Sequence, residues 1–117
     1  MIAFHGTADP VVPYRGGTSW VSPEAFPDVS TWAAHWAERN RCAHTPVASA
    51  AAADVTRLEY PGCAGDAAVV LYTVWGGGHT WPGGQPLPEW WLGATNRNID
   101  ATSLTWAFFR NYRLARE

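Results

Sequence analysis

Two ionisable side chains in this sequence could together move a proton, because each follows a short apolar run. Asp9 lies in the turn after residues 1–5, and His79 lies in the glycine-rich stretch 76–84, after the apolar run 68–75. A carboxylate that accepts the Nδ1 proton of an imidazole fixes its tautomer and leaves Nε2 to take a proton from a hydroxyl group. This pair of residue types is typical of the acid and the histidine of a serine hydrolase triad.

No serine of the chain has the setting that a hydrolase nucleophile needs. That setting is a Gly-x-Ser-x-Gly turn between a buried strand and a helix. Ser19 comes nearest, within residues 17–21, Gly-Thr-Ser-Trp-Val. However, Val21 stands where the closing glycine belongs, and no strand is expected before it. We therefore expect that the 117-residue chain alone does not turn over esters.

Three strands are expected to position these side chains. Residues 1–5 and 68–75 are apolar runs, whereas residues 55–60 alternate in character, as a strand with one buried face does. The run 68–75 is rich in valine and predicts a central strand covered on both faces, antiparallel to 55–60. Asp9 would then follow the carboxyl end of a strand, where open α/β sheets bind ligands.

Two helices complete the expected α/β architecture. Apolar residues recur at helical spacing over 27–40 and over 101–114. Asp28 or Ser30 could cap the first helix, and Asn98 or Asp100 the second. The second helix is expected to be covered extensively by the sheet. Proline and glycine predict an extended surface loop over 11–27 and irregular chain over 82–98. The alanine-rich segment 43–54 contains a proline and lacks a larger apolar face, so it also reads as an irregular connection.

Composition limits the function classes that remain. A chain of 117 residues with 47% hydrophobic and 15% charged residues is expected to be one globular, soluble unit. A net charge of -2 gives no electrostatic footprint for nucleic acid or an anionic membrane. Residues 67–75 are too few to cross a bilayer, and the residues after Met1 lack the pattern of a secretory signal. Neither nucleic acid nor a membrane is expected as a partner.

Two cysteines leave two interpretations open. Cys42 and Cys63 are 21 residues apart and could form a disulfide that contributes about 3 kcal/mol through loop closure. The alternative is two buried thiols, since cysteine is among the residue types most often buried.

Several short motifs, in order, resemble the C-terminal part of the polyhydroxybutyrate depolymerase-like esterases. These enzymes are relatives of feruloyl and acetylxylan esterases within the α/β-hydrolase fold. The motifs are residues 4–14 (Phe-His-Gly-Thr-Ala-Asp-Pro-Val-Val-Pro-Tyr), the tryptophan-bearing helix that ends near Asn40 and Cys42, residues 60–63 (Tyr-Pro-Gly-Cys), residues 78–83 (Gly-His-Thr-Trp-Pro-Gly) and residues 98–101 (Asn-Ile-Asp-Ala) leading into Trp106 and Phe109.

The resemblance implies a role for five residues. Asp9 would be the triad acid and His79 the general base, Trp81 would line an acyl or aromatic pocket, and Cys42 and Cys63 would be bridged as in secreted members. It implies a secreted enzyme without a cofactor, acting on a polyester or on feruloyl or acetyl esters of plant polysaccharide. Residues 1–117 would form one partial α/β-hydrolase domain, the C-terminal part of the sheet, with about three strands and two helices.

In that family the serine elbow and part of the oxyanion hole precede the acid in sequence. The resemblance therefore implies that the N-terminal half of such a domain is absent here. A partner for the exposed strand edge would be that missing half or a second copy of the chain, and we expect self-association of the chain alone.

Two other functions compete with this interpretation. A metal site formed by His5, Asp9 and His79 is conceivable, but no HExxH or paired-cysteine spacing supports it, so no metal is expected. The rival class is a non-catalytic carbohydrate- or aromatic-binding module that uses the loop tryptophans Trp81, Trp90 and Trp91. Such a module should read as many short strands at even spacing, whereas the predicted elements alternate, which favours the esterase.

Three other tryptophans lie at helical spacing within the two predicted helices. Trp32, Trp36 and Trp106 are therefore expected to belong to the core.

Overall fold

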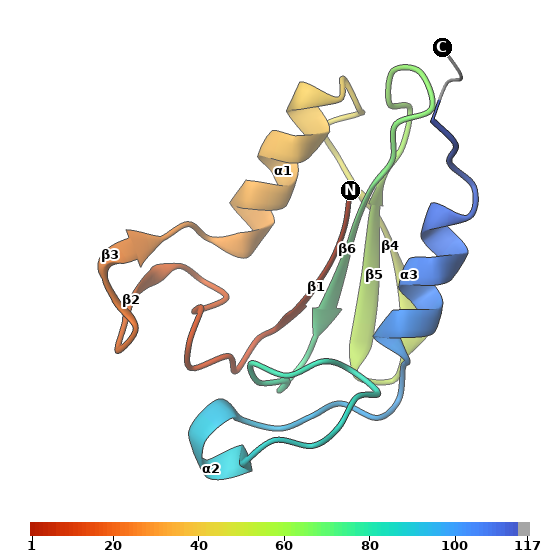
Figure 1. Ribbon diagram of the computed structural model, residues 1–117. Coiled ribbons are helices and arrows are strands. Elements are labelled where there is room, and N and C mark those ends of the chain that lie inside the picture. Colours follow the sequence, from red (N-terminus) through yellow and green to blue (C-terminus); the bar gives the residue numbers. More distant parts are fainter. Residues whose placement is uncertain (115–117) are drawn as a thin grey trace.

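The computed structural model describes residues 1–114, in which six strands form two sheets accompanied by three helices (Figure 1). The larger, mixed sheet has the strand order β1 (Ile2–Gly6), β6 (Val69–Val74), β5 (Val55–Tyr60), β4 (Val47–Ala52). The smaller sheet is the antiparallel pair β2 (Gly17–Ser19) and β3 (Ser22–Phe26). The helices are α1 (Val29–Arg39), α2 (Glu89–Leu92) and α3 (Ala101–Phe109).

The pairing of β1 with β6 brings two loops together. These strands are parallel, in a register that runs from Ile2 opposite Val70 to Gly6 opposite Val74. Parallel strands end at the same edge of a sheet, so the chain segments that follow them, with Asp9 and His79, leave the sheet side by side. The prediction that β5 and β6 are antiparallel is confirmed.

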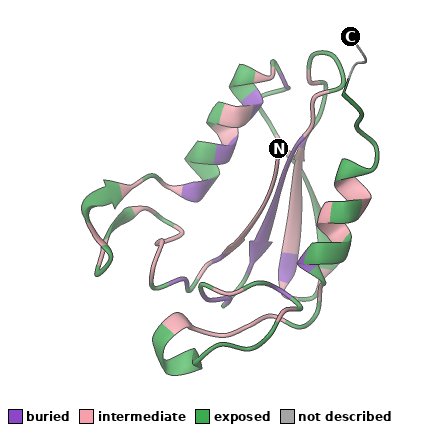
Figure 2. Cartoon of the chain, in the orientation of Figure 1, coloured by how far each residue is buried: buried purple, intermediate pink, exposed green. Residues whose placement is uncertain are grey.

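The central strand β6 is buried along its whole length, as predicted (Figure 2). Its side chains alternate between the two faces of the sheet. Val69 and Leu71 pack in the cluster that contains the buried face of α1, whereas Val70 and Tyr72 pack in the cluster that contains residues of α3. The two helices therefore cover opposite faces of the larger sheet (Figure 1).

Each of the two longer helices is capped by the aspartate among its two candidate caps, Asp28 rather than Ser30 and Asp100 rather than Asn98. The side chain of Asp28 accepts a hydrogen bond from the amide of Thr31, and that of Asp100 accepts one from Ser103, each at 2.9 Å. These bonds satisfy amides that have no partner within the helix. Within the described part of the chain, no helix has the length and apolar character required to cross a membrane.

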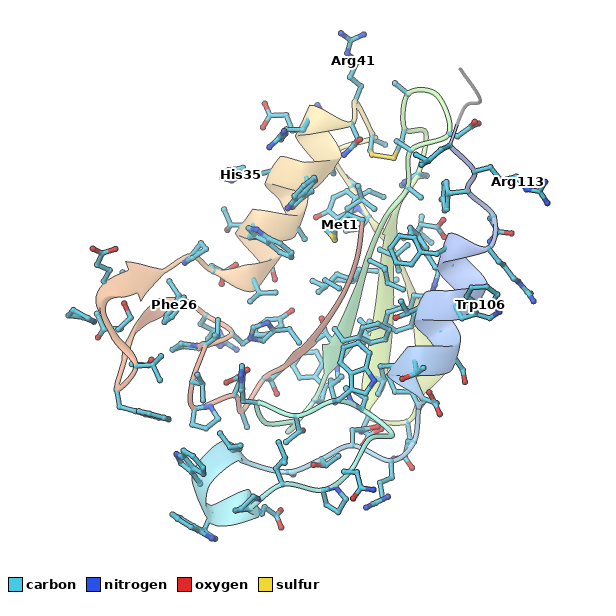
Figure 3. The ribbon with its side chains drawn as sticks, in the orientation of Figure 1. Met1, Phe26, His35, Arg41, Trp106 and Arg113 are labelled. Atoms are coloured by element: carbon cyan, nitrogen blue, oxygen red, sulfur yellow. A yellow bond between two sulfur atoms is a disulfide. The ribbon has the colours of Figure 1, made fainter. Side chains whose placement is uncertain are left out.

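The helices differ from the prediction in which residues they bury. In α1 the buried residues are Val29, Ala33 and Ala37, while Trp32 is 37% exposed. Helix α3 ends at Phe109 rather than 114, and Ala101 is its one buried residue among those described. Trp106 is 70% exposed and points away from the sheet, so its assignment to the core was wrong (Figure 3). Helical spacing identifies a face, but which face is covered depends on the packed layers.

The predicted fold class was also wrong. A C-terminal α/β-hydrolase sheet of about three strands and two helices does not describe residues 1–114, where small sheets predominate and six strands accompany three helices. The alanine-rich segment expected to be irregular forms β4, because its backbone pairs with β5 from Val47 opposite Glu59 to Ala52 opposite Val55. The expected loop over 11–27 contains the β2–β3 pair, and the irregular segment 82–98 contains α2.

A disulfide joins Cys42 to Cys63, which settles the choice between bridged and free thiols. It links the chain just after α1 to the loop after β5. Two backbone hydrogen bonds run beside it, from the amide of Ala43 to Pro61 and from the amide of Ala64 to Asn40, at 2.8 and 2.9 Å. The bridge therefore fastens the end of α1 to the larger sheet.

Strand β1 is an edge strand, paired within residues 1–114 with β6 alone. A groove of about 320 Å³ lies along it, lined by Phe4 together with Trp32 of α1 and Phe109 of α3, among others. Trp32 and Phe109 are 37% and 53% exposed. An apolar edge of this kind is a template for pairing with another strand.

We predict that the protein self-associates through this edge. Size-exclusion chromatography over a range of concentrations should show species larger than the monomer. Phe109→Lys, which places a charge in the groove, should shift the equilibrium toward the monomer. Trp106→Lys is the matched control, since Trp106 lies on the same helix and does not line the groove. A single monomeric species at every concentration would contradict the prediction.

Candidate active site

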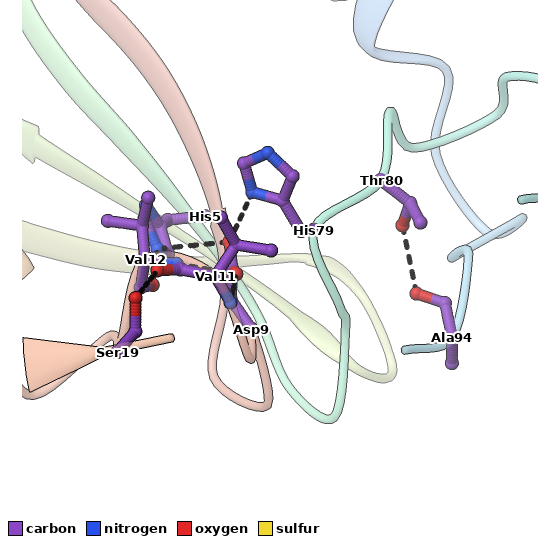
Figure 4. Close-up of polar contacts among 8 residues, drawn as sticks. All are labelled: His5, Asp9, Val11, Val12, Ser19, His79, Thr80 and Ala94. Carbon is purple, nitrogen blue, oxygen red and sulfur yellow. Dashed lines mark hydrogen bonds and ion pairs between the residues drawn. The ribbon is translucent and has the colours of Figure 1, made fainter. Parts of the chain in front are cut away.

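Asp9 and His79 meet at the end of the larger sheet, as a hydrogen-bonded pair (Figure 4). The distance from His79 Nδ1 to Asp9 Oδ2 is 3.0 Å. Asp9 is 9% exposed, whereas the side chain of His79 is 48% exposed. A carboxylate accepts hydrogen bonds and cannot donate them, so Nδ1 carries the proton and Nε2 carries the lone pair of the neutral ring. The chain thus brings together the two residues that the sequence singles out for catalysis.

The Asp9 carboxylate is held by its own loop. Its Oδ1 accepts hydrogen bonds from the amides of Val11 and Val12, at 2.8 and 2.9 Å. Oδ2 faces His79 and lies 3.5 Å from Nε2 of His5, which also donates to the carbonyl of Val12 at 2.8 Å. Because one oxygen is fixed by backbone amides, the other is held in place for the imidazole.

Glycines allow the two loops to approach closely. The amide of Ala8 donates to the carbonyl of Gly77 at 2.9 Å, and the amide of His79 donates to Leu92 at 2.7 Å. A Cβ atom on Gly6 would lie 2.1 Å from the carbonyl oxygen of Gly77, and one on Gly78 would lie 2.2 Å from that of Leu92. Side chains at these positions would separate the loops, so the glycine-rich stretch serves backbone contact around the histidine.

The second imidazole nitrogen of His79 points away from Asp9 (Figure 4). Nε2 makes no hydrogen bond to any of residues 1–114. His79 lines a pocket of about 400 Å³, which Asp9 also lines. A half-exposed Nε2 lone pair beside a pocket can accept a proton from a bound hydroxyl group, with the buried carboxylate stabilising the imidazolium that results.

Trp81 lines the same pocket. Its ring lies 5.8 Å from that of Phe4, and its indole N–H donates to the hydroxyl of Thr102 at 2.9 Å. The ring is 49% exposed. It forms a positioned apolar wall next to the histidine.

Sequence reasoning missed two residues of the pocket, Leu87 and Asn96. Both belong to the segment 82–98, which has no periodic pattern and so gave no local signal. The side-chain amide of Asn96 donates to Asp54 at 2.8 Å, which ties this segment to the turn between β4 and β5. Only the folded chain brings them to the site.

No serine lines this pocket among residues 1–114. Ser19, the serine nearest to the elbow pattern, donates its hydroxyl to the carbonyl of Val11 at 2.6 Å. The hydroxyl of Thr80, which does line the pocket, donates to Ala94 at 2.9 Å. The acid and the histidine are therefore brought together here without a serine among the described pocket residues.

His5, Asp9 and His79 lie together, but their arrangement is not that of a metal site. Over the part of the chain that the structure describes, no group of three or more His, Cys, Asp or Glu side chains is placed to hold a metal ion. Asp9 Oδ2 instead lies 3.0 Å from Nδ1 of His79 and 3.5 Å from Nε2 of His5, so the two imidazoles share one carboxylate oxygen.

Comparison of the chain with known proteins identifies no relative. No family model matches the chain, and neither a curated protein nor a solved structure matches it. The resemblance to polyhydroxybutyrate depolymerase-like esterases therefore stays a prediction from the motifs.

Proposed function

We propose that this protein supplies the acid and the general base of a serine-type carboxylic ester hydrolase. The observation that carries the proposal is the hydrogen bond from His79 Nδ1 to the buried carboxylate of Asp9, which leaves Nε2 unbonded in a histidine that lines a pocket. In acyl transfer, one ring nitrogen of the histidine is held by the acid and the other accepts the proton of the nucleophile. We propose that the serine comes from a segment or partner outside the pocket residues described here.

In the proposed reaction, Nε2 of His79 removes the hydroxyl proton as the serine oxygen attacks the ester carbonyl carbon. The imidazolium then returns that proton to the leaving alkoxide when the ester C–O bond breaks, which releases the alcohol. Water repeats the sequence on the acyl-enzyme, giving the acid and the free serine. Asp9 keeps its negative charge throughout and stabilises the imidazolium.

The pocket favours an ester with an apolar acyl group. Trp81 and Phe4 form an apolar wall next to His79. We propose a polyester, or a feruloyl or acetyl ester of plant polysaccharide, as the substrate. We also propose that the protein is secreted, since the Cys42–Cys63 disulfide suits an oxidising compartment. The proposed reaction uses no cofactor.

An added alcohol can stand in for the serine in a direct test. The purified protein is mixed with p-nitrophenyl acetate and increasing trifluoroethanol, and formation of the trifluoroethyl ester is measured. We expect His79→Ala to lower the protein-dependent rate by about a hundredfold, the lower end of what a positioned general base contributes. Without the alcohol, we expect no burst of p-nitrophenol and no acyl-enzyme, because the described pocket holds no serine.

The matched control is His35→Ala, which removes an exposed imidazole on α1 (Figure 3). Its rate should equal that of the wild type, which would show that an exposed imidazole alone does not account for the rate. Equal rates for His79→Ala and the wild type would refute the proposal. If the protein without alcohol forms an acyl-enzyme at one of its own hydroxyl side chains and His79→Ala abolishes it, the chain carries its own nucleophile, and the external serine is refuted.

A further inference from the structure

Three tryptophans that are distant in sequence form one exposed row. Trp20 follows β2, and Trp90 and Trp91 belong to α2. The ring centroids of Trp20 and Trp91 are 6.2 Å apart, and those of Trp91 and Trp90 are 6.3 Å apart. Exposed fractions are 62% for Trp20, 89% for Trp90 and 49% for Trp91. We call these three residues the tryptophan row. Trp20 had no place in the sequence-based binding hypothesis.

Hydrogen bonds tie each end of the tryptophan row to one half of the candidate active site. On the Trp20 side, the preceding residue Ser19 donates its hydroxyl to Val11, whose amide binds the Asp9 carboxylate. On the other side, Leu92 follows Trp91 directly and accepts the backbone hydrogen bond of His79. The row is thus fixed in position relative to the acid and the histidine.

The geometry of the row suits a flat ligand. The planes of Trp20 and Trp91 differ by 33°, and those of Trp91 and Trp90 by 24°. A cage for an organic cation needs aromatic rings that face one another around a centre, which these near-parallel rings do not provide. Trp90 and Trp91 are stacked and Trp20 is tilted against Trp91, but Trp90 and Trp20 remain 89% and 62% exposed. Their exposed apolar surface suits a ligand that has flat apolar faces of its own.

Charge excludes two other flat or extended ligands. Stacking on aromatic rings is also how single-stranded nucleic acids bind, but they need a basic groove for their phosphates. Here the residue before Trp90 is the exposed Glu89, and the chain has a net charge of -2. The same negative charge disfavours an anionic lipid surface. An uncharged ligand remains.

We propose that the tryptophan row binds a neutral polysaccharide, whose sugar rings stack on the indoles and whose hydroxyl groups stay in water. Binding does not require catalysis. The further step, that the bound chain carries the ester that reaches His79, rests on the proposed function. The sequence-based objection to a carbohydrate-binding surface was an alternation of strand and helix, and the six short strands observed in residues 1–114 remove it.

Affinity electrophoresis in gels containing soluble arabinoxylan tests the proposal. Trp90→Ala and Trp20→Ala should each weaken binding by about tenfold, the scale of losing one stacked ring. Both side chains are largely exposed, so folding should be preserved. Trp106→Ala, at a tryptophan that is 70% exposed on α3, is the matched control and should bind as the wild type does. Asp9→Asn should also bind normally.

The other outcomes overturn the proposal. Equal retardation of Trp90→Ala and the wild type, or no retardation of either, would exclude glycan binding by the row. Adsorption to a polyhydroxybutyrate film that depends on Trp90, without binding to arabinoxylan, would assign the row to polyester. A change of oligomeric state in Trp90→Ala without glycan binding would assign it to self-association. Normal glycan binding combined with failure of the alcoholysis test would refute the hydrolase and leave the binding surface.

Discussion

Asp9→Asn should lower the His79-dependent alcoholysis rate to that of His79→Ala. Asparagine cannot carry the negative charge that stabilises the imidazolium, and its amide NH₂ can donate to Nδ1 and favour the wrong tautomer. In serine proteases this type of change lowers kcat by about 10⁴-fold. That loss exceeds the difference of about a hundredfold expected between the wild type and His79→Ala, so the two variants should have the same rate. The measurement is the rate of ester exchange with trifluoroethanol at fixed pH.

This variant should separate catalysis from folding. The asparagine oxygen can still accept from the amides of Val11 and Val12, which now bind Oδ1 of Asp9. The circular dichroism spectrum should therefore match the wild type, while ¹⁵N spectra should show that His79 loses its fixed Nδ1–H tautomer. Asp66→Asn, at an exposed carboxylate, is the matched control. A rate for Asp9→Asn close to that of the wild type would show that the carboxylate has no part in proton transfer.

Loss of the disulfide should produce the largest change in stability. In a Cys42→Ala, Cys63→Ala double variant, the free energy of unfolding should fall by about 3 kcal/mol, because the unfolded chain gains the freedom of a loop that the bridge closes. The two cysteines are 21 residues apart. Cys42 is also 8% exposed in the cluster under α1, so its replacement removes some packing. Urea titration followed by circular dichroism gives the value.

Reduction distinguishes the cross-link from the packing. Dithiothreitol should lower the urea midpoint of the wild type and leave that of the double variant unchanged. If reduction of the wild type has no effect on the midpoint, the bridge does not stabilise the fold, and any loss in the double variant belongs to packing. The hydrogen bonds that flank the bridge, from Ala43 to Pro61 and from Ala64 to Asn40, would then be sufficient.

Local pattern was enough to predict the elements that carry the site. The apolar run of β6 and the alternation of β5 predicted two antiparallel strands, and the caps Asp28 and Asp100 marked two helix starts. These signals are local because strand burial and capping depend on residues within a few positions of each other. Asp9 and His79 were identified for the same reason, since each follows a strand directly.

The predictions that failed concern features that depend on contacts between distant segments of the chain. Nothing in the composition of 43–54 indicates a strand, and β4 exists because β5 offers its backbone as a partner. Helical spacing placed Trp106 in the core, whereas the packing of the layers leaves it exposed. Leu87 and Asn96 joined the pocket for a similar reason, as their segment is held by contacts with residues far along the chain.

The sequence by itself determined which side chains could do chemistry: an acid and a histidine at two strand ends, two cysteines, and tryptophans in loops. Only the tertiary structure decided how they combine. The parallel pairing of β1 with β6 set His79 Nδ1 at 3.0 Å from Asp9, and the contact between two distant loops set Trp20 beside Trp91. Residue type is a local property, whereas distance between segments follows from the pairing of strands and loops that no local pattern encodes.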